Sequence, residues 1–376
     1  MIFVILLITF ALLIWLQRLL YSRYWSSKLT AELSFSARVG QEGEQLFLNE
    51  QISSSKPLPL PWLTVKFQVS RYLLFPDNAN ATVSDDYYRE DLFSLGMYQR
   101  ITRKLPVQLK RRGYFTIKSI DLISNDLLLT QKMVKHVSSS SILTVCPRLI
   151  PREDLLIPYQ HLVGEIIARN SLNPDPFEFR SIREYQSYDT MRSINWMATA
   201  RTGNLKVNVH EVTAARDVLI LLNVEPDGAF YEERLIEEAI RIAGSLTQYL
   251  IEDGVSCSFL TNARDIVSRE ICSISQGRSQ QHVQTVLEQL GRLDLDQNPA
   301  VFSGLLAQRL ETKHDADPVM VMISLNCSTK LVNIWDDYLA GGGRGSWIVP
   351  RYNDGRSRLP DISGAVYAWE VRNHGG

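Results

Sequence analysis

The chain has 376 residues, of which 45% are hydrophobic and 22% charged, and its formal net charge is -1. This length has room for roughly two or three domains with hydrophobic cores, while the near-neutral charge argues against a nucleic-acid partner, which requires a basic face. The four cysteines are far apart and form no CxxC pair, so the sequence indicates neither a zinc site nor a disulfide-rich module.

The first residues, MIFVILLITFALLIWLQRLLYSRYW, predict a transmembrane anchor over residues 1–25. The initial apolar run and the turn after it would form a helix about 30 Å long, close to the thickness of a bilayer core. Arg18, Arg23 and Lys28 follow the apolar run, whereas a cleaved signal peptide has its positive charge in front.

The same charge asymmetry predicts an external N-terminus and a cytoplasmic main body, with an external body as the alternative. We therefore expect a single span in the inner (cytoplasmic) membrane. Four aromatic residues are expected at the lipid–water interface: Trp15, Tyr21, Tyr24 and Trp25.

Short alternating apolar runs, broken by turn residues, predict a β-sandwich domain of roughly six or seven strands over residues 29–147. The expected strands are LTAELSFSARV, EQLFLNEQIS, PWLTVKFQVS, QRITRKLPVQLK, YFTIKSIDLIS and SSILTVCP. Residues 148–210 are expected to form a loop-rich connector.

Strands and helices alternate from residue 211 to residue 376. DVLILLNV is a continuous apolar run typical of a strand buried on both faces. YEERLIEEAIRIAGSLTQYLIEDG follows it with apolar residues at helical spacing. The alternation continues to the C-terminus and predicts a Rossmann-like α/β domain, with a parallel sheet covered on both faces.

The sequence contains no GxSxG, HExxH or GxGxxG motif, so we expect a non-enzymatic protein without catalytic residues or cofactor. One loop offers candidate ligands for a cation. Asn223, Glu225 and Asp227 follow the first strand of the α/β domain, and oxygen ligands at this spacing can hold Mg²⁺. The favoured alternative is that the two carboxylates cap the helix expected to begin near Tyr231.

The segment FEFRSIREYQSYDTMRSINWMATARTGNLKV resembles the signature of the domain of unknown function 58 family. The resemblance extends upstream to RRGYFTIKSIDLISNDLLLTQK and VCPRLIP, and downstream into the α/β domain. The matching positions are Phe179, Arg180, Arg183, Tyr185, Asp189, Arg192, Ile194, Trp196, Thr199, Ala200, Arg201, Leu205 and Val207.

The resemblance implies a von Willebrand factor A-like α/β domain and a MoxR-type AAA+ ATPase as partner, in the assembly of envelope or other protein complexes. Three departures stand out. The family's Asp-Pro-Phe-Gly is reduced to the stretch 126–129, its Gly-Asp pair becomes Tyr188-Asp189, and its metal-binding D-x-S-x-S becomes the stretch 223–227. We therefore expect the family's metal-adhesion site to be lost.

Asp189 is the only acid between Glu184 and Glu211, and Arg183, Arg192 and Arg201 lie around it in the sequence. It is interpreted either as an ion-pair lock between domains, with cations also stacked on Tyr185 and Trp196, or as an exposed surface for a protein partner. The leading hypothesis is a membrane-anchored adaptor that binds the ATPase and other membrane or envelope proteins. The alternative is a sensor that binds a divalent metal or another ligand through the loop at 223–227.

Overall fold

The computed structural model describes residues 2–76, 81–83, 86–156, 158–164, 179–186, 191, 194–210, 217–228, 232–311, 318–353 and 359–371. The chain divides into two compact units, Met1–Arg148 and Leu149–Gly376. The predicted connector therefore falls within the second unit.

Unit 1 begins with the helix α1 (Ile2–Tyr24), which is long and apolar enough to cross a membrane. Tyr21 in its last turn and Trp25 just after it are buried in the domain that follows, at 2% and 6% exposed. The expectation that these two aromatics lie at a lipid interface is therefore wrong. The ammonium of Lys56 donates to the backbone carbonyls of Tyr24 and Trp25, where a cation stabilises the end of the helix.

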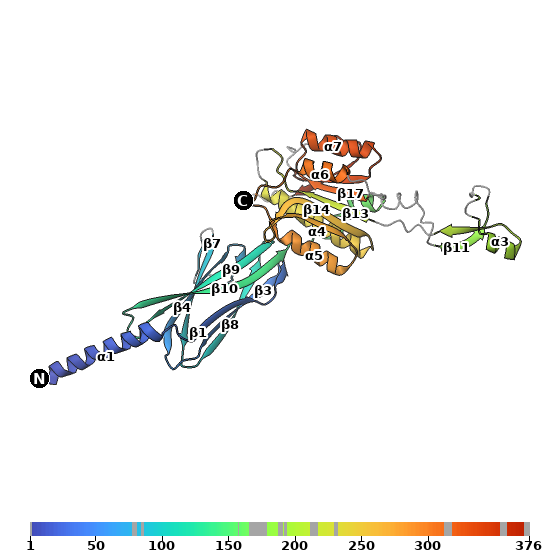
Figure 1. The fold of residues 1–376 in the computed structure, drawn as a ribbon. Helices are drawn as coiled ribbons and strands as arrows, with labels where there is room; N and C mark the ends of the chain where they lie inside the picture. The colour runs from blue at the N-terminus through green and yellow to red at the C-terminus, as the bar shows by residue number, and fades with distance from the viewer. Residues whose placement is uncertain are drawn as a thin grey trace. The chain divides into compact units, whose positions relative to one another are not determined.

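The rest of unit 1 consists of two sheets, in the orders β1-β3-β8-β5 and β2-β10-β9-β4-β7-β6 (Figure 1). Buried and exposed residues alternate along the long strands, as the period of a strand requires, and the buried side chains of both sheets form one hydrophobic cluster. The strands are β1 (Leu29–Phe35), β2 (Val39–Gln41), β3 (Gln45–Ser54), β4 (Leu60–Ser70), β5 (Leu73–Leu74), β6 (Ala81–Val83), β7 (Asp86–Leu95), β8 (Arg100–Leu109), β9 (Gly113–Asn125) and β10 (Lys132–Cys146).

The strand β7 is missing from the expected set because its sequence, DYYREDLFSL, is rich in charge. Those charges are compatible with a strand because Arg89 and Asp91 are buried together and joined by an ion pair of 2.7 Å. A buried charge is tolerated when it is paired, and the pairing depends on neighbours that the local pattern does not reveal.

Unit 2 opens with a segment that is tied to α4 (Glu233–Glu252). Ile150 N donates to Ser245 Oγ at 2.8 Å, and its carbonyl accepts from Tyr249 Oη at 2.5 Å. Residues 158–164 are helical, and Tyr159 donates to the carboxylate of Asp253. The start of the predicted connector is therefore part of the α/β core.

The α/β domain is built on a sheet in the order β15-β14-β13-β17-β18-β19. The pairs from β14 through β19 along this order are parallel, whereas β15 pairs antiparallel with β14. The sequence does not predict β15, which follows β14 after a short turn instead of a helical crossover. The strands are β13 (Asp217–Asn223), β14 (Ser256–Asp265), β15 (Ile271–Gly277), β16 (Leu293–Asp294), β17 (Val319–Ser324), β18 (Gly345–Tyr352) and β19 (Ala365–Val371).

Helices cover both faces of this sheet, as expected (Figure 1). Val218, Ile220 and Leu222 of β13 belong to a cluster with α4 and α5. Leu219 and Leu221 belong to a second cluster, with α6 and α7. Because neighbouring residues of a strand point to opposite faces, the continuous apolar run of β13 supplies both cores. The remaining helices are α5 (Gln280–Gly291), α6 (Phe302–Glu311) and α7 (Thr329–Ala340).

Candidate functional site

The arginine-rich signature folds as a hairpin that holds a short helix. The strands β11 (Phe179–Glu184) and β12 (Lys206–His210) pair antiparallel, and α3 (Trp196–Thr202) lies between them in the chain. Asn195 caps the start of α3 by accepting from Ala198 N at 2.9 Å. Gly203 ends it in the left-handed conformation, with φ of 73°, and donates to Thr199 O.

Further hydrogen bonds connect the helix to the strands. Asn195 N donates to Lys206 O at 2.8 Å, and Lys206 N donates to Thr199 Oγ1 at 3.0 Å. Ile194 and Val207 form a β-bridge and are both buried. The segment has more regular structure than the expected loop-rich connector, and these contacts fix α3 relative to β12.

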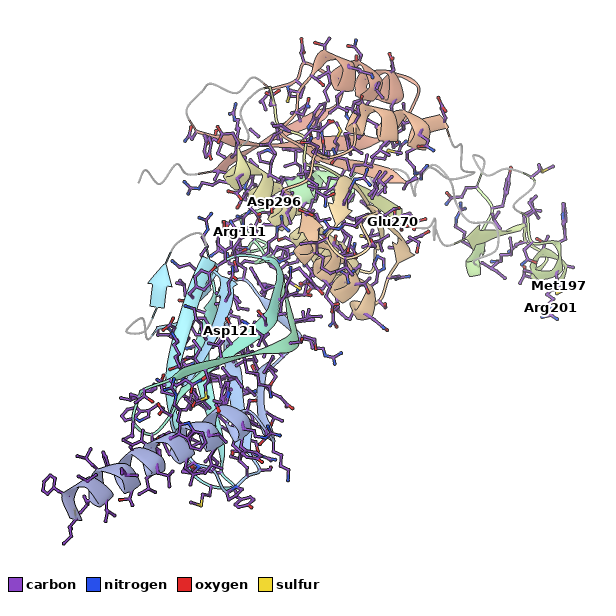
Figure 2. All side chains as sticks on the ribbon, turned by 60° about the vertical axis from the view of Figure 1, so that its left-hand side comes forward. Arg111, Asp121, Met197, Arg201, Glu270 and Asp296 are labelled. Carbon is purple, nitrogen blue, oxygen red and sulfur yellow. The ribbon has the colours of Figure 1, made fainter. Side chains whose placement is uncertain are left out.

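The side chains that α3 presents are large and exposed (Figure 2). Trp196 is 65% and Met197 72% exposed, and Arg201 on the last turn is exposed as well. Other exposed apolar residues of the same segment are Ile182, Met191 and Leu205. We call Trp196, Met197 and Arg201 the α3 surface.

The structure brings together only part of the predicted motif. Arg183 donates to the carbonyl of Glu184 at 3.1 Å, and Tyr185 is half-buried, with its backbone N–H bonded to Leu205 O. Arg180 lies on β11, and nothing further is described for its side chain. Asp189 and Arg192 lie outside the described residues, so the ion-pair lock centred on Asp189 remains a prediction.

A second concentration of polar side chains lies where β13, β14 and β17 end. Asn223 Nδ2 donates to Ser324 Oγ at 3.0 Å, and Asn223 Oδ1 accepts from Asn262 Nδ2 at 2.9 Å. Asn262 Oδ1 accepts from Val224 N at 3.0 Å. The side chains of Asn223, Asn262 and Ser324 are completely buried. In an open α/β sheet this end is the usual place for a ligand, but here the amides bond to one another.

The two carboxylates of the candidate cation loop, Glu225 and Asp227, have different surroundings. Glu225 Oε1 accepts from Phe302 N at 3.3 Å, at the first residue of α6, where the helix dipole favours a negative charge. Burial raises the pKa of Glu225 above its ordinary value, and the bonds from Phe302 and Asn223 act in the opposite direction. Asp227 is exposed.

The interpretation that Glu225 caps the helix near Tyr231 is therefore wrong about the helix. The N-cap position of α4 is Glu232, which makes no capping bond with its side chain. Glu225 instead accepts a hydrogen bond from the first residue of α6. This helix begins far away in the chain and approaches the loop because both adjoin the same end of the sheet.

The donor set at this loop fits a cation poorly. Asn223 uses its amide nitrogen on Ser324 and its oxygen on Asn262 and on Glu225 N. A hard cation such as Mg²⁺ prefers carboxylate oxygens, and the buried ligand position holds a neutral amide whose oxygen already accepts two hydrogen bonds. In the part of the chain that the structure describes, no group of three or more His, Cys, Asp or Glu residues could hold a metal ion.

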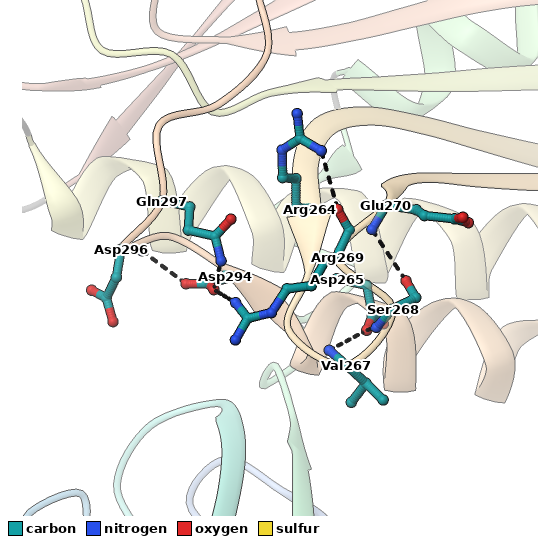
Figure 3. A network of polar contacts seen from close by, with 9 residues as sticks. All are labelled: Arg264, Asp265, Val267, Ser268, Arg269, Glu270, Asp294, Asp296 and Gln297. Carbon is teal, nitrogen blue, oxygen red and sulfur yellow. Dashed lines mark hydrogen bonds and ion pairs between the residues drawn. The ribbon is translucent and has the colours of Figure 1, made fainter.

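Figure 3 shows a charged network beyond the end of β14 that the sequence does not predict. Asp265 accepts from the backbone of Val267 at 2.6 Å and of Ser268 at 2.9 Å, which closes the turn into β15. Asp294 accepts from Arg269 at 2.9 Å and from Gln297 Nε2 at 2.8 Å. These bonds join the turn to β16 and the segment after it, so their role is structural.

Comparison with known families gives a match, which covers the hairpin and the first part of the α/β domain. Residues 181–326 match the model described as "Protein of unknown function DUF58". The match over these residues supports the DUF58 family. The match begins in β11 and ends just after β17, so it includes the α3 surface as well as the buried amide network.

A comparison with curated proteins found no match. Similar solved structures include the CARDB domain of a Pyrococcus furiosus protein in complex with di-metal ions, at 13% identity over 31% of this chain and 86% of that chain, with a TM-score of 0.22. A non-cellulosomal cohesin from Archaeoglobus fulgidus has 10% identity over 36% of this chain and 98% of that chain, with a TM-score of 0.20. Scores this low support no inference about fold or function.

Proposed function

We propose that this protein is a non-enzymatic adaptor of the DUF58 family, anchored in a membrane by α1 and binding a partner protein through the α3 surface. The observation that carries the proposal is the exposure of Trp196 and Met197, at 65% and 72%, on a helix capped at both ends. A group of exposed apolar side chains on a fixed helix is the kind of surface that marks a protein interaction site.

The chemistry of the α3 surface suits a protein partner. Tryptophan, methionine and arginine are enriched in the centres of protein interfaces, and tryptophan and arginine dominate the binding energy there. The caps at Asn195 and Gly203 hold the helix before binding, which lowers the entropy lost on association.

We propose a MoxR-type AAA+ ATPase as the partner, and the assembly of envelope or other protein complexes as the process. Both come from the family resemblance. The ATPase would supply energy while the adaptor positions a client at the membrane. Orientation follows the basic residues after the apolar run, so the two soluble units are proposed to be cytoplasmic at the inner membrane.

For unit 1 we propose a β-sandwich, supported by its two sheets with one shared hydrophobic cluster. For the α/β domain we propose a von Willebrand factor A-like module. Numbered by their place in the chain, its main strands run 3-2-1-4-5-6, the order of a doubly wound fold.

The alternative function, a sensor that binds a ligand through the loop at 223–227, is weaker because the buried amide of Asn223 is already bonded on both sides.

The test is photo-crosslinking of the full chain in its native membranes. A photoreactive amino acid at Met197 should give an adduct that contains an AAA+ ATPase. The same amino acid at Val267, which is 56% exposed in the α/β domain, is the matched control and should not. An adduct pattern that is the same at both positions, or no ATPase at Met197, would contradict the proposal.

A charge reversal completes the test. Arg201→Glu on the α3 surface should weaken co-purification of the ATPase by about 30-fold or more if Arg201 is a hot spot. Arg234→Glu, in the exposed first turn of α4, is the control, because an acid is well tolerated at the start of a helix. Equal retention of the ATPase by both folded variants would remove the α3 surface from the interface.

A further inference from the structure

The helix α1 leaves only a short apolar segment free for a membrane. Its last turn is held by the domain, where Tyr21 Oη donates to Pro59 O at 2.8 Å and the side chain is buried. Residues 2–16 are the free apolar part. At about 1.5 Å per residue they extend roughly 22 Å, which is less than the roughly 30 Å of a hydrocarbon core. Unit 1 must therefore lie close to the lipid surface if α1 spans it.

The turn between β9 and β10 carries three consecutive exposed leucines. Leu127, Leu128 and Leu129 are 48%, 53% and 58% exposed. We call them the leucine tip. A run of three apolar residues at the end of a hairpin is unfavourable in water and departs from the polar turns that usually close strands.

The conformation of this turn is fixed. The buried carboxylate of Asp126 accepts from Thr130 N at 2.6 Å, Thr130 Oγ1 at 2.6 Å and Gln131 N at 3.0 Å. Leu129 adopts a left-handed conformation, with φ of 57°, which is strained for a leucine. Hydrogen bonds to a buried acid thus hold the leucine tip outward instead of letting it fold back on the sheet.

The leucine tip lies beside α1 at the point where its apolar segment ends. Gln17 Nε2 donates to Asp126 Oδ2 at 3.4 Å, and Arg18 Nε donates to Gln131 Oε1 at 3.1 Å. These bonds tie both sides of the turn to the first polar residues after the apolar run. Arg18 and Lys132 are exposed at the same place, where cations would meet anionic headgroups.

We propose that the leucine tip enters the lipid interface beside α1 and forms a second contact between unit 1 and the bilayer. This inference rests on the membrane anchor of the proposed function. The partner is a lipid bilayer because the tip adjoins the end of the spanning helix and combines exposed leucines with neighbouring cations, the chemistry of an interfacial segment. Two contacts would fix how unit 1 faces the membrane, which a single helix cannot do.

The experiment places an environment-sensitive dye at single sites of the full chain, through an azide-bearing amino acid that leaves the cysteines unchanged. The chain is reconstituted in vesicles of zwitterionic lipid with a minority of anionic lipid. A dye at Leu128 should be quenched by spin-labelled lipid and several-fold less by aqueous iodide than a dye at Ser119. Ser119 is exposed on β9, about 20 Å along the strand from its end at Asn125, where the turn with the leucine tip begins.

A dye at Phe10, in the exposed apolar part of α1, tests the anchor separately. If the dyes at Leu128 and Ser119 are equally accessible to iodide while the dye at Phe10 is in lipid, the anchor stands and the second contact is wrong. If the dye at Phe10 is also in water, the anchor fails and the inference fails with it.

A dye can itself draw a turn into lipid, so a second measurement leaves the tip unlabelled. The dye is attached at Lys132, and the wild-type chain is compared with the variant Leu127→Ser, Leu128→Ser and Leu129→Ser. Because all three side chains are exposed, the variant should fold normally. Quenching by spin-labelled lipid should fall in the variant, and equal quenching in both chains would overturn the proposal.

Discussion

Replacing Glu50 with glutamine should remove a specific pH dependence from the stability of unit 1. Glu50 on β3 is 1% exposed and accepts from Arg103 of β8 at 2.9 Å. Arg103 also pairs with Asp91 of β7, at 2.6 Å, and Asp91 pairs with Arg89. These four side chains form a network between the two sheets, in which Glu50, Asp91 and Arg89 are buried and Arg103 is partly exposed.

The size of this pH-dependent change in the free energy of unfolding follows from the pKa of Glu50. Burial raises this pKa from its ordinary 4.5 to about 7, although the positive charge of Arg103 lowers it. The folded state therefore binds a proton more tightly than the unfolded state, and the associated stability is complete below pH 4.5 and lost as the pH rises to about 7. At about 1.36 kcal/mol per pKa unit, the loss is about 3 kcal/mol.

Urea-dependent hydrogen exchange of peptides from β3 and β8 in the full chain measures this stability separately from the α/β domain. The difference between wild type and Glu50→Gln should fall by about 3 kcal/mol between about pH 4 and about pH 8. Glu90→Gln is the control, because the side chain of Glu90 is 52% exposed and pairs with Lys66 on the surface. A difference between wild type and Glu50→Gln that does not change with pH would refute the reasoning.

Two further predictions concern the α/β domain. Trp335→Ala should destabilise this domain by about 3 to 5 kcal/mol, because Trp335 is completely buried against Trp347. Thermal unfolding measures this loss. The control Trp196→Ala, at an exposed position, should leave the melting temperature nearly unchanged. Calorimetric titration of wild type with Mg²⁺, Mn²⁺ and Ca²⁺ should show no saturable binding, since the buried amide of Asn223 is already bonded. Saturable binding that disappears in the double variant Glu225→Ala, Asp227→Ala would instead favour the sensor.

The sequence predicts well those elements whose burial repeats with the period of the backbone. The strands β1, β3 and β4 alternate between buried and exposed positions, and their sequences show the same alternation. The continuous apolar run of β13 and the apolar stripe of α4 likewise correspond to one strand buried on both faces and one helix packed on a sheet. The family signature is also local, and the match over residues 181–326 bears it out.

Features that depend on partners distant in the chain are decided only by the tertiary structure. The polar strand β7 is stable because Asp91 meets Arg103 of the other sheet, and Tyr21 leaves the expected lipid interface because its hydroxyl reaches Pro59. Glu225 caps α6 instead of the helix that follows it in the chain. In each case the free energy comes from desolvation and pairing between residues that are not neighbours in the chain, from 12 positions apart for Asp91 and Arg103 to 77 for Glu225 and Phe302. A local sequence pattern carries the period of an element but not the identity of its neighbours.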